Sequence, residues 1–308
     1  MFYSAFINII ILLIYIVIGY FSGLWKFINT EVNGGISKLV FNITMPCMIL
    51  SSFKAENNTE GIYKNILILM ILYIVFKIIW IIISFAIFAT KRDQKFSTDR
   101  FSSLFPNAGY MGIPMTQAII GDHALIYTSI YVIFFNIFLN SLGTIIYKGN
   151  IRFKALVKVF INPSIIAVCL GLMLFILKVD FPMILSKPIA ALGNMTTPLS
   201  FITLGYTLTE SSLKELFKGK FQYFICVLKL IIIPFSAMLI FKPIMGSSLM
   251  LDTFILIESM PIAALGLIFA NNFKPEESEY ASKIIFLSTI LSFITIPLMT
   301  YINSIVKF

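Results

Sequence analysis

The architecture follows from one segment, Pro106-Asn107-Ala108-Gly109-Tyr110-Met111-Gly112-Ile113-Pro114. It lies inside an apolar run, residues 101–120, that is long enough to cross a lipid bilayer. Two prolines and two glycines so close together do not suit a continuous helix, because proline removes a backbone donor and glycine is a poor helix former. Unwound backbone at membrane depth is tolerated only where it is buried in protein or lines an aqueous cavity. This segment is therefore our first candidate for a binding site.

The composition predicts an integral membrane protein. Hydrophobic residues make up 59% of the 308 residues, charged residues make up 12%, and the mean hydropathy is +0.96. Because a soluble domain carries about 25% charged residues, lipid must be the outer solvent of this chain. The net charge of +9 could indicate nucleic-acid binding. The basic residues fall mainly between apolar runs, however, where they determine topology, so we do not expect nucleic acid as a partner.

Ten apolar runs of roughly 20 residues predict ten transmembrane helices. Lys and Arg are concentrated in the loops after the odd-numbered runs. The positive-inside rule places these loops in the cytoplasm and both termini outside. The abundance of Ile, Lys, Asn and Phe is typical of an AT-rich genome, so we expect a bacterial cytoplasmic membrane. The predicted spans are 3–24, 34–53, 65–89, 101–120, 124–146, 156–177, 182–208, 221–243, 249–270 and 280–303.

Short matches recur along the chain at a nearly constant offset. Residues 42–46 and 194–198 both read N-x-T-x-P, and they are 152 residues apart. The same offset of 152 residues separates two lysines in the middle of apolar runs, Lys77 and Lys229. Matches in one register are difficult to attribute to chance.

The offset is close to half of the chain and predicts an internal duplication. Pro106 and Pro261, in the fourth and ninth runs, are 155 residues apart. We expect a first five-helix repeat over residues 1–150 and a second over 151–308. Because five is odd, the second copy enters the membrane with the opposite orientation, an arrangement that recurs among secondary transporters.

The ninth run is the counterpart of the fourth, with a central proline and a nearby glycine in residues 258–266. Two interrupted helices in matching positions indicate a binding site, because a half-helix that begins after the break offers unpaired N–H groups to a carboxylate. The alternative is that the prolines only kink packed helices. The expected substrate residues include Asn107, Pro106, Ser259 and Pro261. The residues expected to support the breaks are Gly109, Gly112, Pro114 and Gly266.

Charged and amide side chains inside the predicted spans are further candidates. A lysine at the centre of a span costs about 2.5–3.5 kcal/mol, so we expect the ammonium groups of Lys77 and Lys229 to face the carbonyl ends of half-helices. The alternative is a polar pocket between helices with no role in transport. Glu258 is a candidate for carrying a proton or binding Na⁺, unless it is permanently hydrogen-bonded. Asn42 and Asn194 face a substrate cavity or pair across helices.

Other functional classes have weaker support. An intramembrane enzyme would need a catalytic cluster, and the single histidine, His123, lies in a short turn. The three cysteines show no metal-binding spacing, so we expect no metal and no cofactor beyond a coupling ion, Na⁺ or H⁺. A membrane receptor or sensor that binds a non-carboxylate ligand on a transporter-like scaffold stays an alternative, as does a passive channel.

Residues 106–114, followed by Ile120-Gly121-Asp122, resemble the signature of the auxin efflux carrier family, which includes bacterial malate and malonate permeases. Met260-Pro261 and residues 270–273 are similar to the equivalent stretch of the ninth span, and residues 42–46 are similar as well. The resemblance covers the whole chain.

The resemblance implies two crossing broken helices, spans four and nine. It implies a scaffold of helices 1, 2, 6 and 7, a mobile transport domain of helices 3–5 and 8–10, and a homodimer. It implies a carboxylate held near Asn107 and Pro106 and moved by alternating access. Related crossover folds place an acidic residue at an ion site, a role that would suit Glu258. Plant members carry a Gln where this chain has Ile262-Ala263-Ala264, which favours a small dicarboxylate or another weak acid over auxin.

Overall fold

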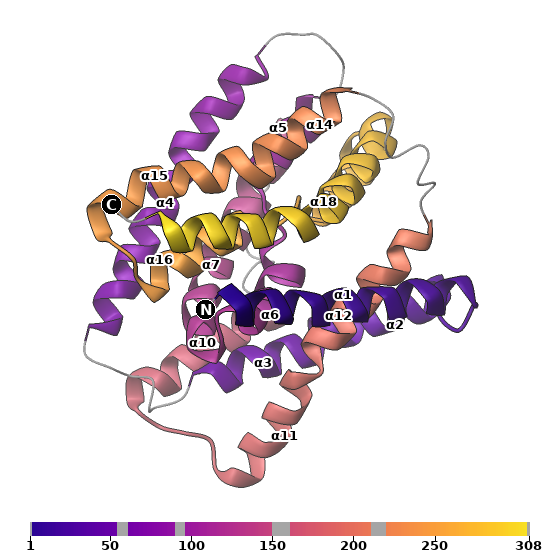
Figure 1. Ribbon diagram of the computed structural model, residues 1–308. Coiled ribbons are helices and arrows are strands. Elements are labelled where there is room, and N and C mark those ends of the chain that lie inside the picture. The colour runs from indigo at the N-terminus through magenta and orange to yellow at the C-terminus, as the bar shows by residue number, and fades with distance from the viewer. Residues whose placement is uncertain (1, 54–60, 90–95, 150–160, 211–219, 307–308) are drawn as a thin grey trace.

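A computed structural model describes residues 2–53, 61–89, 96–149, 161–210 and 220–306, and within these ranges the protein is helical without a strand (Figure 1). The helices are α1 (Phe2–Leu24), α2 (Thr30–Leu39), α3 (Met45–Ser52), α4 (Ile62–Ile87), α5 (Phe96–Leu104), α6 (Ile113–Ile119), α7 (Leu125–Phe138), α8 (Thr144–Lys148), α10 (Pro163–Leu177), α11 (Met183–Asn194), α12 (Thr196–Thr207), α14 (Lys220–Val227), α15 (Ile233–Met245), α16 (Leu249–Glu258), α17 (Leu265–Phe273) and α18 (Ser278–Ile305). The π-helical turns are η1 (Val40–Thr44), η3 (Ala108–Gly112), η5 (Leu139–Gly143) and η7 (Leu228–Ile232).

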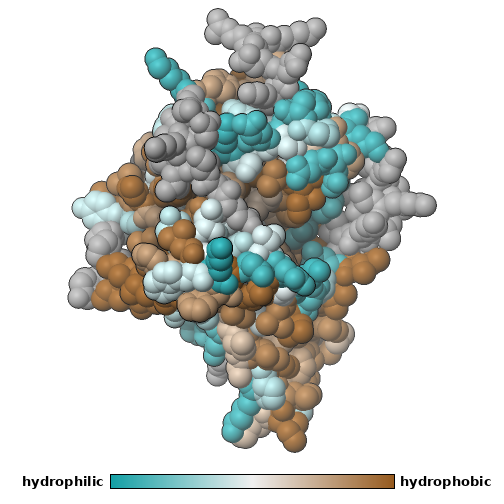
Figure 2. All heavy atoms as spheres, turned by 90° about the vertical axis from the view of Figure 1, so that its right-hand side faces the viewer, coloured by the Kyte–Doolittle hydropathy of each residue, from teal (hydrophilic) through white to brown (hydrophobic). Residues whose placement is uncertain are grey.

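The expectation of an all-helical membrane protein is confirmed. Among the described residues, six helical segments are long and apolar enough to cross a membrane. Large apolar side chains are exposed on the outside, among them Ile184, Ile244 and Phe27, and Figure 2 shows hydrophobic side chains at the surface over much of one face. Lipid is the solvent that such a surface requires. The six segments are Ile7–Leu24, Thr30–Ser52, Ile62–Ile87, Asp122–Lys148, Lys220–Met245 and Pro275–Ile305.

The other four predicted spans contain shorter helices. Run 101–120 is divided into α5, η3 and α6, and run 249–270 into α16 and α17. Run 156–177 contains α10, and its first residues lie outside the described part of the chain. Run 182–208, which we expected as one helix, is interrupted at Met195 between α11 and α12. The cause is Pro198, since a proline ring clashes with the carbonyl four residues earlier, here that of Asn194.

Three π-turns lead directly into a proline. Helices α3, α6 and α15 follow η1, η3 and η7, and each carries a proline at its second position, Pro46, Pro114 and Pro234. Proline cannot donate the backbone hydrogen bond to residue i−4, and its ring presses on that carbonyl. The wider π-turn gives the carbonyl room, so the chain passes each of these prolines without leaving helical geometry.

Helices α1 and α12 pack at unusually close range (Figure 1). A Cβ atom at Gly19 would lie 2.0 Å from the carbonyl oxygen of Ile202, and one at Gly205 would lie 2.1 Å from that of Ile16. Only glycine at both positions lets the two backbones touch, which is how membrane helices gain packing energy in the absence of a hydrophobic drive. Helix α3 packs in turn against α10 and α11.

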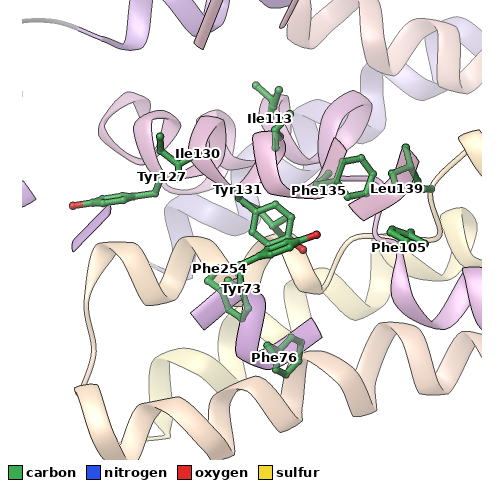
Figure 3. Close-up of a cluster of buried hydrophobic side chains, with 14 of the residues drawn as sticks. Tyr73, Phe76, Phe105, Ile113, Tyr127, Ile130, Tyr131, Phe135, Leu139 and Phe254 are labelled. Carbon is green, nitrogen blue, oxygen red and sulfur yellow. The ribbon is translucent and has the colours of Figure 1, made fainter. Parts of the chain in front are cut away.

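The centre of the molecule is a cluster of buried aromatic side chains from α4, α7 and α16 (Figure 3). The rings of Tyr73 and Tyr131 meet edge to face, with centroids 4.8 Å apart. Phe76 and Phe254 pack beside them, with centroids 5.4 Å apart. This cluster surrounds the charged groups described below.

Candidate functional site: a helix crossing and a cavity

The chain leaves helical conformation at two places that face each other. Helix α5 ends at Leu104 and the next helical turn begins at Ala108, while α16 ends at Glu258 and α17 begins at Leu265. An isolated antiparallel bridge pairs Pro106, in the first gap, with residue 262 in the second. The two interruptions are therefore paired through their backbones, and this paired region is called the crossing below.

Backbone hydrogen bonds hold the crossing together. The N–H of Asn107 donates to the carbonyl of Pro261 at 2.7 Å, and the N–H of Ala263 donates to the carbonyl of Phe105 at 3.0 Å. The N–H of Ile262 donates to the hydroxyl of a serine on α18 at 3.2 Å. The two unwound segments thus satisfy each other's backbone groups, which non-helical backbone within a membrane protein requires.

The predicted glycines and prolines support this geometry in different ways. Gly266 faces the ring of Phe101, where a Cβ atom would lie at 2.8 Å, so glycine lets α17 approach α5. At Gly112 a Cβ atom would lie 3.3 Å from the carbonyl oxygen of Asn107. Pro114 directly follows η3, whose wider turn makes room for the proline ring. A Cβ atom at Gly109 would meet open space.

The carbonyl ends of both half-helices face ammonium groups. Nζ of Lys77 donates to the carbonyl of Leu104, the last residue of α5, at 2.8 Å. Nζ of Lys229 donates to the backbone carbonyl of Glu258, the last residue of α16, at 3.1 Å. The last carbonyls of a helix carry partial negative charge, so each lysine lies where its charge is best compensated.

The carboxylate of Glu258 lies between the two ammonium groups. Its oxygens are 2.9 Å from Nζ of Lys77 and 3.6 Å from Nζ of Lys229, and the hydroxyl of Tyr131 donates to it at 2.6 Å. The exposed fractions of the three charged side chains are 3%, 0% and 0%. Nζ of Lys77 also lies 5.4 Å from the centroid of the Tyr73 ring. These groups form a buried network of two positive charges and one negative charge, referred to below as the lysine–glutamate network.

A cavity of about 690 Å³ adjoins the crossing, and neither lysine of the network nor Glu258 is among its lining residues. Asn107, Gly109 and Tyr110 line it from one half of the crossing, and Ala263, Ala264 and Leu265 line it from the other. Each set stands at the start of a helical segment, the first before α6 and the second before α17. The remaining lining residues are Ser37, Phe41, Asn42, Met45, Val132, Phe135, Asn136, Asn162, Pro163, Ser164, Thr203, Leu204, Thr207, Leu267, Ile268, Ser282, Ile285, Phe286 and Thr289.

Sequence comparison connects this geometry with known proteins. A family described as membrane transport protein matches residues 4–150 and 148–300. The chain belongs to this family of membrane transport proteins. An uncharacterized transporter of Methanocaldococcus jannaschii is 24% identical over 305 residues, which are 96% of this chain and 97% of that protein. The resemblance of residues 106–114 to the auxin efflux carriers is thereby confirmed, and the membership indicates a transporter and not an enzyme.

In this membrane transport protein the predicted site residues fall into separate groups. Asn107 and Asn42 line the cavity, while Glu258, Lys77 and Lys229 form the network behind the crossing. Asn194, at the end of α11, is exposed and lies outside the cavity lining. Pro106 and Pro261 belong to the paired segments without lining the cavity. Ser259 also lies outside the cavity lining, and its hydroxyl donates to the carbonyl of Ile255 in α16 at 2.8 Å.

Several cavity residues were not predicted. Tyr110 stacks on Phe41, with ring centroids 5.1 Å apart, and its hydroxyl contacts Thr203 on α12. Asn162 caps the N-terminus of α10 by accepting from the N–H of residue 164 at 2.9 Å. The Asn-Pro pair at the start of α10 was a visible helix-start signal, whereas nothing in the sequence distinguishes Asn136 from other polar residues inside apolar runs.

Proposed function

We propose that this protein is a secondary transporter that carries small organic anions, held in the cavity by helix N-termini and moved by alternating access. The observation that supports this proposal most directly is that three helical segments begin at the cavity. Residues 107–110 precede or open the η3–α6 segment, residues 162–164 open α10, and residues 263–265 lead into α17. First-turn N–H groups lack acceptors within their helix and favour an anion. At α10 the N–H of residue 164 is already bound by the side chain of Asn162, so the starts of η3 and α17 are the main candidates.

Asn107 adds the most direct side-chain contact. Its exposed fraction is 6%, it lines the cavity, and its side-chain amide makes no hydrogen bond within the described part of the chain, although its backbone groups are paired. A buried amide without a partner is costly, so a substrate carboxylate that accepts from it gains binding energy. Asn42 is less available, because its amide already donates to the carbonyl of Lys38 at 2.8 Å.

The walls of the cavity narrow the class of anion. Its lining residues include many apolar side chains and, among the described residues, no charged one. A second carboxylate would be desolvated without a cationic partner, which is costly. Of the two classes that the sequence favoured, a small dicarboxylate or another weak acid, we therefore favour the second, as a monocarboxylate with an apolar body.

An inverted repeat is the architecture that best accounts for the paired contacts. Gly19 of α1 faces α12, and Gly171 of α10, 152 residues later, faces Phe53 at the end of α3. Lys77 and Lys229 bind the ends of α5 and α16 in the same way. We propose ten spans in two halves, residues 1–150 and 151–308, with spans four and nine broken at the crossing. The two family matches, 4–150 and 148–300, support this division.

We expect the ten predicted spans to form two parts. Spans 1, 2, 6 and 7 form a scaffold, and spans 3–5 and 8–10 form a transport domain that moves against it. The cavity supports this division, because its lining includes Asn42 and Thr203 from the former and Asn107 and Ala264 from the latter. A homodimer and two extracytoplasmic termini stay predictions, which the mass of the purified protein and labelling of terminal tags would test.

The test is uptake by proteoliposomes. Labelled indole-3-acetate, malate and malonate are supplied to wild type, to Asn107→Ala and to Asn194→Ala, an amide of the same type outside the cavity. We expect saturable uptake of the monocarboxylate, at least tenfold lower in Asn107→Ala for the loss of roughly 1.5–3 kcal/mol from a charged hydrogen bond, and unchanged in Asn194→Ala. Equal uptake by both variants, or no uptake of any carboxylate by folded protein, would refute the proposal.

A further inference from the structure

The lysine–glutamate network occupies the places where a coupling cation would bind. In carriers with discontinuous helices, the carbonyl ends of half-helices and unwound backbone carbonyls coordinate Na⁺ or H⁺, while the opposite ends face the anionic substrate. In this protein the carbonyl of Leu104 accepts from Lys77, and the backbone carbonyl of Glu258 accepts from Lys229, both within 3.1 Å. The carbonyl ends of both half-helices are thus already bound to a cation that belongs to the protein.

The charge balance leaves no attraction for another cation. Two ammonium groups and one carboxylate give the buried network a net positive charge, and both Glu258 oxygens already have cationic or hydroxyl partners. A metal ion entering this network would meet repulsion in a region of low dielectric constant, where such interactions are strong.

Other acidic side chains near the helices are also engaged. Asp252 accepts from the amide of Asn303 at 2.7 Å, and Asp99 accepts from Tyr280 at 2.8 Å. Glu277, buried, accepts from the N–H of residue 98 at 2.8 Å. No group of three or more His, Cys, Asp or Glu able to hold a metal ion occurs in the part of the chain that the structure describes.

We propose that the C-termini of α5 and α16 are cation-binding sites, called the seats below, which the ammonium groups of Lys77 and Lys229 occupy. Each seat should bind a small primary ammonium ion when its lysine is replaced by alanine. The resident charges then stand in for an alkali ion, and anion transport proceeds without Na⁺. The consequence for transport rests on the proposed function, whereas the seats themselves are testable by binding.

The first test measures thermal unfolding of purified full-length protein in detergent. Lys77→Ala and Lys229→Ala remove the three carbons and the nitrogen that propylammonium contains, so propylammonium chloride should raise the unfolding midpoint of both variants saturably. N-methylglucamine chloride at equal ionic strength is too large to enter and should have no effect. Lys187→Ala, which removes an exposed lysine of α11, is the matched control and should not respond to propylammonium.

We expect each buried-lysine variant to unfold at a midpoint roughly 5–10 °C lower than wild type, because the buried carbonyl of Leu104 or of Glu258 loses its donor and the missing side chain leaves a cavity. Propylammonium should recover part of that loss. The same small response in Lys187→Ala and in the buried-lysine variants would overturn the proposal.

Wild-type protein decides the question even if both variants fail to fold. Its midpoint should be the same in sodium chloride and in N-methylglucamine chloride, and saturable stabilisation by Na⁺ would show a vacant alkali-ion site and overturn the proposal. In proteoliposomes, uptake should be equal in the two salts. Uptake that requires Na⁺ would refute the proposal that the two lysines replace a coupling ion, but it would leave the transporter function intact. Absence of uptake would refute the transporter function, and the unfolding data would then decide whether the seats bind cations.

Discussion

The lysine–glutamate network makes a quantitative prediction for the substitution Glu258→Gln. Glutamine keeps the shape and can still accept from Tyr131, but it leaves two ammonium groups buried near each other without a negative partner. Loss of one member of a buried ion pair costs about 3–5 kcal/mol. At about 2–4 °C per kcal/mol for large domains, the unfolding midpoint should fall by roughly 10 °C.

A compensating variant separates this charge effect from simple loss of packing. In Glu258→Gln combined with Lys229→Met, one of the two unbalanced charges is gone, and apolar replacements of buried ion pairs are close to neutral. The double variant should therefore unfold at a higher temperature than the single one. Glu31→Gln, at an exposed position of α2, controls for the change of acid to amide. Thermal unfolding in detergent measures all four proteins. The reasoning fails if Glu258→Gln has the same unfolding midpoint as wild type, or if the double variant has a lower midpoint than Glu258→Gln.

Two further substitutions test packing and movement. Gly19→Ala places a methyl group 2.0 Å from the carbonyl oxygen of Ile202, so α1 and α12 must separate and the unfolding midpoint must fall. Gly34→Ala, with nothing within 4 Å, should leave it unchanged. Tyr110→Phe keeps the ring but loses the contact of its hydroxyl with Thr203. If this contact must break in each transport cycle, loss of about 1 kcal/mol should raise the maximal uptake rate about fivefold, and an unchanged rate would exclude a role for the contact.

Much of the crossing could be predicted because it follows from local chemistry. Pro106 and Pro261 stand in the two gaps between helices, since a proline cannot continue the hydrogen-bonding pattern of an α-helix. The lysines in the middle of apolar runs required negative partners, and the carbonyl ends of interrupted helices were the nearest that the pattern offered. Their sharing of Glu258, and the hydroxyl of Tyr131 on the same carboxylate, depend on how α4, α7 and α16 pack.

The prediction that treated Asn42 and Asn194 as equivalent shows the limit of the repeat. Both precede a proline by four residues. Before Pro46 the chain passes through a π-turn, and Asn42 lines the cavity. Before Pro198 the helix is interrupted at Met195, and Asn194, the last residue of α11, lies outside the cavity lining. A proline in the sequence indicates that the carbonyl of residue i−4 must be displaced. Whether the helix then widens into a π-turn or is interrupted depends on tertiary packing.

The two ends of the broken segments explain why a transporter of this kind would combine prolines with buried lysines. A break creates a positive N-terminus and a negative C-terminus at the same depth. The positive ends, near Asn107 and Ala264, adjoin a cavity lined without a charged side chain in the described residues, so under the proposed function the backbone itself would supply the attraction for an anion. The negative ends would repel that anion if they were left bare. Lys77 and Lys229 neutralise these ends by donating to their carbonyls, and neither lysine is part of the cavity lining. An anion would then be bound by helix dipoles and not by an ion pair with a lysine. Binding by dipoles is weak enough to allow release, whereas a buried ion pair would hold the anion, and a transporter must release its substrate.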